Sequence, residues 1–367
     1  MNMENLSSFF WSLTHLLRIL LANIVPGDVV GAVSWNQREW KHPIKQLGAN
    51  DIRTLVRQTP DQFVNFNQTL DKILVVRVPG TEAHRHVKEF INETMTELGY
   101  TVEEDAFSAN TPHGTKPFTN IIATLNPKAC KRIILACHYD SKYYPGNKFV
   151  GAIDSAVPCS MLIELARALR PSLRLQSQIS YQHTIQFVFF DGEEAFESWN
   201  EDDSLYGSRH LALKWNRQRF PKTHEDKNRC PGDYASELDR IDVLVLLDLL
   251  GTAGPTFYNF FPDTNPLYAN LVRAEQQLNN LKLMEPEPPK SSTNYFRNRL
   301  NFGIIEDDHK PFLRRNVPVV HIIPSPFPSV WHKFTDNRDA LSHRTINNLM
   351  KIFKCFIVEY LNLEIIQ

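Results

Sequence analysis

Beyond about residue 105, apolar runs with the length of strands alternate with stretches of helical periodicity. The apolar runs lie at 120–125, 132–137, 184–190, 243–249 and 318–323. The main helical patterns lie at 159–170, 267–281 and 345–363. Continuous apolar strands separated by helices are typical of a mostly parallel sheet that is buried on both faces. The pattern therefore predicts an α/β fold with helices on both faces of a central sheet.

Other parts of the chain do not follow this alternation. Residues 51–105 have helical periodicity and are predicted to form helices before the first strand. The segments 222–240 and 284–312 are rich in Pro, Asn and charge, and are predicted to be long loops. Loops of that length in a compact domain usually build a functional site or are disordered.

Residues 1–33 differ from the rest of the chain. They are rich in apolar residues, but His15, Arg18 and Asp28 interrupt them, so no charge-free stretch is long enough to span a bilayer. We interpret this segment as a degraded signal peptide that lacks the usual basic start; an amphipathic helix or an organelle address is the alternative. Residues 34–367 are then expected to form one domain.

Composition narrows the class of protein. Apolar residues make up 42% and charged residues 22% of the chain, as in globular proteins. A net charge of −1 and the lack of a long basic run argue against nucleic-acid binding. The five cysteines have no zinc-knuckle spacing, and one pair could form a disulfide in an oxidising compartment. Glycosylation sequons at Asn67 and Asn92 mildly favour a secretory route.

Acidic and histidine residues gather where the predicted strands end. They are His138 and Asp140, then Asp191, Glu193 and Glu194, then Asp248, and finally His321 and His332, with Asp154 in a loop before a helix. A single acid at a strand end usually caps a helix or solvates a turn. Acids after three consecutive strands would meet at one edge of a parallel sheet, where like charges raise each other's pKa unless a cation compensates.

A metal ion is the simplest such cation. Carboxylates combined with imidazole suit zinc, and a mononuclear catalytic site has three protein ligands and one open position. Asp154, Glu194 and His332 would supply a mixed set of ligands. Because only one of two adjacent glutamates easily faces the metal from a turn, Glu193 would be left for proton transfer beside it.

Several segments resemble the animal glutaminyl-peptide cyclotransferases, from about residue 35 to the C-terminus. The segments that carry the resemblance read ACHYDSK, GAIDSAVPC, FFDGEEAFESW, DSLYGSRHLA, LLDLLGT, EDDHKPFLRR and VPVVHIIPSPFPSVWH. That family is related to zinc aminopeptidases. The resemblance implies a single-domain, twisted mixed sheet of about six strands, as in the aminopeptidases, with helices on both faces.

The resemblance also implies roles for individual residues. It implies one zinc per chain held by Asp154, Glu194 and His332, with Glu193 as proton shuttle and Asp248 assisting it. The residues implied for substrate binding are Trp199, Asp307, His321, Phe327 and Trp331. The assignment of Asp307 instead of the adjacent Asp308 depends on the register of the motif. The positions of Cys137 and Cys159 match a disulfide of secreted members.

The implied reaction is cyclisation of the N-terminal glutamine (possibly glutamate) of peptides to pyroglutamate, with release of ammonia from glutamine. A two-zinc aminopeptidase is the alternative, because His138 and Asp248 occupy positions that hold a second zinc in those relatives. An inactive, peptide-binding relative is a third hypothesis. We expect a monomer without a stable membrane span, secreted or in the secretory pathway, with a mitochondrial or Golgi location as the alternative.

Overall fold

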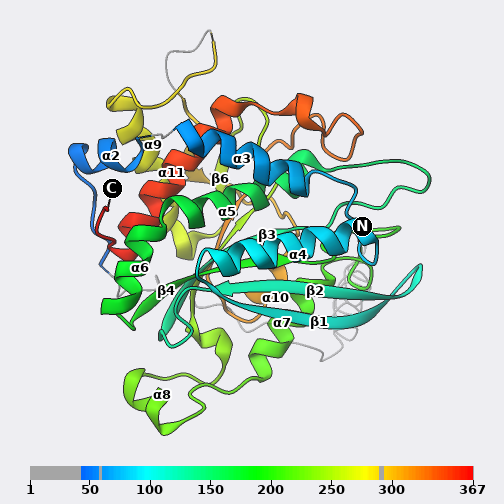
Figure 1. Ribbon diagram of the computed structural model, residues 1–367, viewed down its shortest axis with the longest axis horizontal. Helices are drawn as coiled ribbons and strands as arrows, with labels where there is room; N and C mark the ends of the chain where they lie inside the picture. Colours follow the sequence, from blue (N-terminus) through cyan, green and yellow to red (C-terminus); the bar gives the residue numbers. More distant parts are fainter. Residues whose placement is uncertain (1–42, 58–59, 289–292, 367) are drawn as a thin grey trace, which may run out of the picture. The chain divides into compact units, whose positions relative to one another are not determined.

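A six-stranded sheet forms the centre of the fold (Figure 1). The computed structural model describes residues 43–57, 60–288 and 293–366. The strands, in the order in which they pair, are β1 (Thr101–Thr111), β2 (Gly114–Thr124), β4 (His183–Phe190), β3 (Lys131–His138), β5 (Ile241–Leu247) and β8 (Val319–Ile322). β1, β2 and β4 pair antiparallel, whereas β4, β3, β5 and β8 run parallel. The carboxyl ends of the four parallel strands therefore lie along one edge.

Helices pack on both faces of this sheet because its inner strands are apolar on both sides. In β3, Leu135 faces one hydrophobic core and Ala136 faces the other, as the two-residue period of a strand requires. The first core is covered by α2 (Ala49–Leu55), α3 (Pro60–Ile73), α4 (Glu82–Glu97), α5 (Val157–Ala168), α6 (Arg170–Ile179), α9 (Asn265–Asn280) and α11 (His343–Leu361). The second core is covered by α7 (Tyr206–Arg217) and α10 (Lys310–Leu313). The predicted α/β class and mixed sheet are confirmed.

The prediction for residues 51–105 was wrong at its end. α4 ends at Glu97 and β1 begins at Thr101. β1 is an edge strand that is exposed along most of its length, so its sequence has no apolar run to mark it. An antiparallel edge hairpin is thus added to the predicted parallel core.

The two predicted long loops contain short elements. The first holds α8 (His224–Arg229), which has no buried residue. The second holds β7 (Phe296–Leu300), which pairs with β6 (Phe257–Asn259) in a separate two-stranded sheet. The second loop also leads into α10 and supplies residues to the site described below.

The expected disulfide between Cys137 and Cys159 is not formed. Both thiols are free and buried, and the Cys159 thiol donates to the carbonyl oxygen of His138, at 3.1 Å. The disulfide instead joins Cys130 to Cys230, whose Cα atoms are 5.2 Å apart. Cys130 precedes β3 and Cys230 follows α8, so the bond ties an otherwise exposed segment to the sheet. The motifs could not reveal this pair, because neither cysteine lies in the segments that carry the resemblance.

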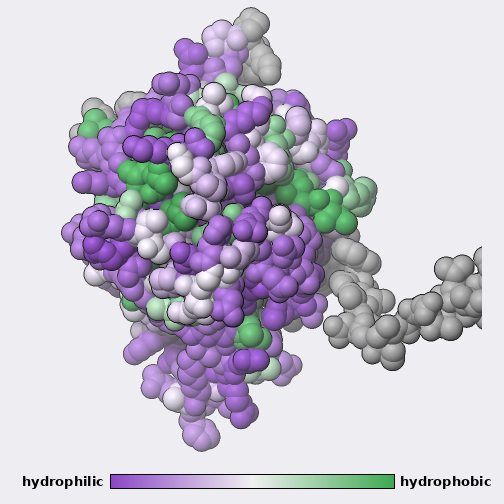
Figure 2. Space-filling view, turned by 90° about the vertical axis from the view of Figure 1, so that its right-hand side faces the viewer, coloured by the Kyte–Doolittle hydropathy of each residue, from purple (hydrophilic) through white to green (hydrophobic). Residues whose placement is uncertain are grey.

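Hydrophilic residues cover most of the face shown in Figure 2, and hydrophobic residues gather there in separate areas. Within the described residues, no helix is both long enough and apolar enough to cross a membrane. The predicted N-terminal targeting segment, 1–33, lies outside the described residues.

Candidate metal centre and active site

Asp154, Glu194 and His332 converge although they are far apart in the sequence. The Nε2 atom of His332 lies 3.4 Å from Oδ2 of Asp154 and 3.3 Å from Oε1 of Glu194. One potential ligand atom from each residue lies within 4.8 Å of the other two. The three residues predicted as zinc ligands are therefore brought together.

Two oxygens of this group lack ordinary hydrogen-bond partners. Oδ2 of Asp154 and Oε1 of Glu194 are buried and accept no hydrogen bond from the described residues. A buried carboxylate oxygen without a partner is costly, and a cation between these atoms would satisfy both. With one imidazole and two carboxylates, the donor set is one that zinc accepts.

Local structure explains why each ligand points inwards. Asp154 lies in the turn Ala152–Ala156 between β3 and α5, where its own backbone is not helical (φ −121°, ψ 72°), and it is buried. Glu194 follows the end of β4, and His332 has a left-handed backbone (φ 54°) in the loop after β8. Burial disfavours the charged form of His332, but Asp154 and Glu194 outweigh it and raise the His332 pKa to about 9.

Arg77 fixes the loop that carries Asp154. Its guanidinium is completely buried and donates to the carbonyl oxygens of Tyr139 (2.7 Å), Gly151 (3.0 Å) and Asp154 (3.2 Å). It also donates to the carbonyl oxygens of Val75 and Val150. One rigid side chain thereby joins the end of β3 to the turn that presents a predicted metal ligand. No pattern in the sequence predicted a role for this residue.

The turn after β4 gives its two glutamates different surroundings. The carboxylate of Asp140 accepts from the backbone N–H of Glu193 (3.1 Å) and of Glu194 (3.2 Å) and so fixes both. Gly192 has φ of 69°, and a Cβ there would come within 2.4 Å of Phe118, so a side chain does not fit. Glycine is therefore required where the chain turns between the strand and the paired acids.

Glu193 is buried beside the metal group. Burial raises the pKa of its carboxyl well above the usual value, and the nearby charges of Glu194, Asp307 and Asp308 add to that increase, against an opposing effect of His138. A carboxyl with a raised pKa can both accept and return a proton near neutral pH. This is the property that a general base and acid needs.

His138 contacts the second carboxylate oxygen of Asp154, Oδ1, whereas His332 contacts Oδ2; Asp248 lies beside His138. Nε2 of His138 is 3.1 Å from Oδ1 of Asp154 and 3.4 Å from Oδ1 of Asp248. Ser155 donates its hydroxyl to the same Asp248 oxygen. Burial, followed by the charges of Asp307 and Asp154, raises the Asp248 pKa to about 6 despite the opposing effect of His138. His138, Asp154 and Asp248 thus form a second group that could hold a metal, with Asp154 shared.

The residues predicted to bind substrate form two clusters. Trp331 stacks on His332 with ring centres 4.1 Å apart, and Phe327 packs edge-on against Trp331 at 4.8 Å. In the second cluster, Nε2 of His321 and Oδ2 of Asp307 are 2.7 Å apart. Asp307, and not Asp308, is therefore the partner of His321.

Trp199 stands next to the second cluster. Its indole N–H donates to the carboxylate of Glu306 at 3.3 Å, and Glu306 precedes Asp307 in the chain. The indole of Trp199 is 40% exposed and that of Trp331 is 38% exposed, which is unusual for such large apolar side chains. Exposed aromatic residues beside a buried charged centre are typical of a ligand pocket.

His309, for which the sequence predicted no role, also lies in this second cluster. Its ring centre lies 4.4 Å from that of His321, with the two rings tilted by 44°, and burial followed by the charge of His321 lowers its pKa to about 3. Its Nδ1 atom has no hydrogen-bond partner among the described residues. The motif EDDH contained the only sequence signal for this residue.

The fold and the site place the chain in a known class of proteins. Residues 120–357 match the model of Peptidase family M28. A solved zinc-dependent exopeptidase from Parabacteroides distasonis shares the fold, with 21% identity and a TM-score of 0.59 over 85% of this chain and 98% of its own.

Within this class, the chain belongs to the glutaminyl-peptide cyclotransferase family. It is 43% identical to the Bos taurus glutaminyl-peptide cyclotransferase over 95% of this chain and 96% of that protein. It is 45% identical to the Drosophila melanogaster protein of the same name, over 90% of this chain and 87% of that one. The crystal structure of Macrostomum lignano glutaminyl cyclase covers 88% of this chain and 96% of its own, with 36% identity and a TM-score of 0.78. The resemblance seen in the motifs is confirmed.

Proposed function

We propose that this enzyme cyclises N-terminal glutamine of peptides to pyroglutamate and releases ammonia, with one zinc ion held by Asp154, Glu194 and His332. The observation that carries the proposal is the convergence of these three side chains beside the buried Glu193. The substrate's own α-amine is the nucleophile, so no serine or cysteine nucleophile is needed.

The surroundings of the three residues support zinc as the cofactor. The unpartnered oxygens of Asp154 and Glu194 face the imidazole of His332, which completes a three-ligand set. When bound, zinc would act as a Lewis acid that polarises the γ-carboxamide oxygen of the substrate. Because the three ligands come from three separate loops, the site forms only when the sheet is folded.

Glu193 would move the proton during the reaction. Its carboxylate would accept a proton from the attacking α-amine and return it to the leaving nitrogen, which typically contributes about 10²- to 10⁴-fold to the rate. Asp248 would orient the amine, since its carboxyl lies at the end of β5 with Oδ1 held by Ser155. Asp140 fixes the backbone from which the Glu193 side chain would reach the substrate.

The aromatic residues would fold the substrate's side chain towards its own amine. Trp331 and Phe327 pack together next to His332, and Trp199 stands by Asp307 and His321. Holding the reacting groups of one molecule in contact gives a large intramolecular advantage. Attack by water is not part of this reaction, so an apolar pocket suits cyclisation better than hydrolysis.

A two-zinc aminopeptidase is the second candidate, and the group of His138, Asp154 and Asp248 favours it. Against it, the relatives at 43% and 45% identity over most of the chain are glutaminyl-peptide cyclotransferases. Incubation of the protein with a Gln-initiated peptide separates the two functions. Cyclisation releases ammonia and leaves one pyroglutamyl peptide, whereas release of free glutamine would identify an aminopeptidase.

The same proposal includes the secretory pathway as the location. The Cys130–Cys230 disulfide supports an oxidising compartment, because such bonds seldom persist in the cytosol. Expression of the full chain in animal cells, followed by analysis of the medium and of N-glycans at Asn67 and Asn92, tests this location. Retention in mitochondria would support the alternative.

A further inference from the structure

We infer that a charged pocket beside Trp199 binds an acidic side chain of the peptide substrate, downstream of the N-terminal glutamine. The inference rests on the proposed function and extends it to substrate selection. The pocket encloses about 240 Å³. Its charged lining residues are Glu201, Asp202, Arg209, Glu306, Lys310 and Arg314.

The pocket adjoins the proposed substrate site through two links. Glu306 lines the pocket and accepts the hydrogen bond from the Trp199 indole, at 3.3 Å. Asn200, which also lines the pocket, follows Trp199 in the chain. An extended peptide advances about 3.3–3.6 Å per residue. A substrate whose first residue lies against Trp199 would therefore carry one of its next residues past this pocket.

Two of the three cations, Lys310 and Arg209, are less exposed than the carboxylates, whereas Arg314 is 58% exposed at the rim. The side chain of Lys310 is 19% exposed, whereas those of Glu306 and Glu201 are 41% and 70% exposed. Arg209 is half-buried and donates to two backbone carbonyls, those of Leu205 and Asp202, each at 3.3 Å. An anionic group that enters the pocket would meet positive charge at its base.

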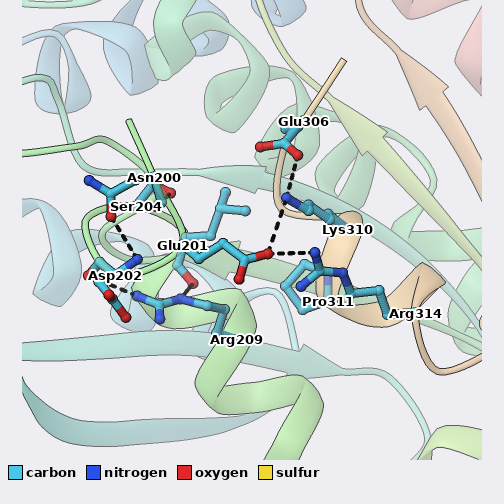
Figure 3. A pocket seen from close by; sticks show the side chains of 10 residues that line it. Asn200, Glu201, Asp202, Ser204, Arg209, Glu306, Lys310, Pro311 and Arg314 are labelled. Carbon is cyan, nitrogen blue, oxygen red and sulfur yellow. Dashed lines mark hydrogen bonds and ion pairs between the residues drawn. The ribbon is translucent and has the colours of Figure 1, made fainter. Parts of the chain in front are cut away.

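Glu201 occupies the position that such a group would take. Its carboxylate bonds to Arg314 at 2.6 Å and lies 3.9 Å from Lys310, and Figure 3 shows it pointing between the two. Lys310 also contacts Glu306. Exposed ion pairs of this kind are weak, so a substrate carboxylate can replace Glu201 at little cost.

This arrangement selects an acidic ligand and not a basic one. The carboxylates that a lysine side chain would approach, Glu201 and Glu306, already have cationic partners. The positive charges of Lys310 and Arg209 would then repel it. An aspartate or glutamate side chain needs only to displace the exposed carboxylate of Glu201. The pocket would thereby raise kcat/KM for peptides that carry an acidic residue at the matching position.

Competition between matched peptides tests the inference. Gln-initiated peptides carry a single Asp or its isostere Asn at positions two to five, and ammonia release gives the kcat/KM ratio at each position. We expect an Asp preference of about 2- to 5-fold at one position, as one or two surface ion pairs would give. Higher salt should reduce it, because exposed charges are screened.

Two substitutions with opposite effects make the result independent of folding defects. Arg314→Gln should reduce the ratio towards one, whereas Glu201→Gln, which removes the competing carboxylate, should increase it. Arg299→Gln, an arginine on β7 outside this pocket, is the matched control and should leave the ratio unchanged. A ratio of one at every position, or a preference for Asn over Asp that Glu201→Gln abolishes, would overturn the inference. Failure to cyclise any peptide would instead overturn the proposed function on which it rests.

Discussion

The two adjacent glutamates after β4 differ because the turn directs them to different partners. The carboxylate of Glu194 faces His332 and also bonds to Lys142 at 3.1 Å. Glu193 is buried among other acids, and its pKa is raised by burial first and by those acids second. One residue is thereby suited to hold a cation and its neighbour to exchange a proton. The sequence led us to expect such a division, because a turn rarely directs two successive side chains to one point.

Replacement of Glu193 by glutamine tests the division. Glu193→Gln should retain zinc and lose about 10²- to 10⁴-fold in turnover, the usual contribution of a general base. Glu194→Gln is the matched variant and should lose zinc. Metal analysis of both purified proteins, together with ammonia release, provides the measurement. Turnover of Glu193→Gln within tenfold of the parent would contradict its role.

Zinc binding should depend on pH through His332. Burial alone would lower its pKa, but Asp154 and Glu194 raise it to about 9, so the metal-free imidazole is protonated at neutral pH. That proton must leave before Nε2 can bind zinc. The apparent zinc affinity should therefore rise by about tenfold per pH unit as pH increases towards 9.

Chelator competition at pH 6, 7 and 8 measures this dependence. The chelator's own affinity for zinc also changes with pH, and its known pKa values allow this change to be subtracted. An affinity that is constant between pH 6 and 8 would show that His332 carries no proton in the metal-free protein.

Among the elements of the fold, the sequence predicted where the parallel strands end, but not the residues that hold the loops after them in place. His138 and Asp248 follow apolar runs that any inner parallel strand would have, so the sequence indicated that they meet at one edge. β1 escaped prediction because an exposed edge strand needs no apolar run. Arg77 escaped it because its partners are backbone carbonyls, which have no signature in the sequence.

Arg77→Lys tests whether that support matters for the metal. Lysine keeps the charge but cannot reproduce the fork of donors that spans Tyr139, Gly151 and Asp154. We expect zinc affinity to fall by about 10- to 100-fold, as when groups that orient ligands are lost. Arg85→Lys, on the exposed surface of α4, is the control. Unchanged zinc affinity in a folded Arg77→Lys protein would contradict the positioning role.

For the molecule as a whole, the disulfide joins the start of β3 to the exposed segment around α8, which is not part of the sheet. Cys130–Cys230 closes a loop with a sequence separation of 100 residues, and long loops are the ones that a disulfide stabilises most in the chain-entropy model. Replacement of both cysteines by serine should lower the free energy of unfolding by about 2–4 kcal/mol.

Denaturant unfolding of the parent and the double variant gives that difference. Peptide mapping under non-reducing conditions identifies the linked cysteines independently. A Cys137–Cys159 link in the map, with Cys130 and Cys230 as free thiols, would show that the pairing is the one first expected from the motifs.

Two groups of potential metal ligands share Asp154, so the number of zinc ions bound by the whole molecule distinguishes a cyclase from a two-zinc aminopeptidase. Titration of the metal-free protein with zinc, with ammonia release from a Gln-initiated peptide recorded at each step, determines whether one zinc ion is sufficient for cyclisation. We expect activity to reach its plateau at one zinc per chain. Activity that requires a second equivalent of zinc, or a protein that forms no pyroglutamate at any zinc level, would contradict it.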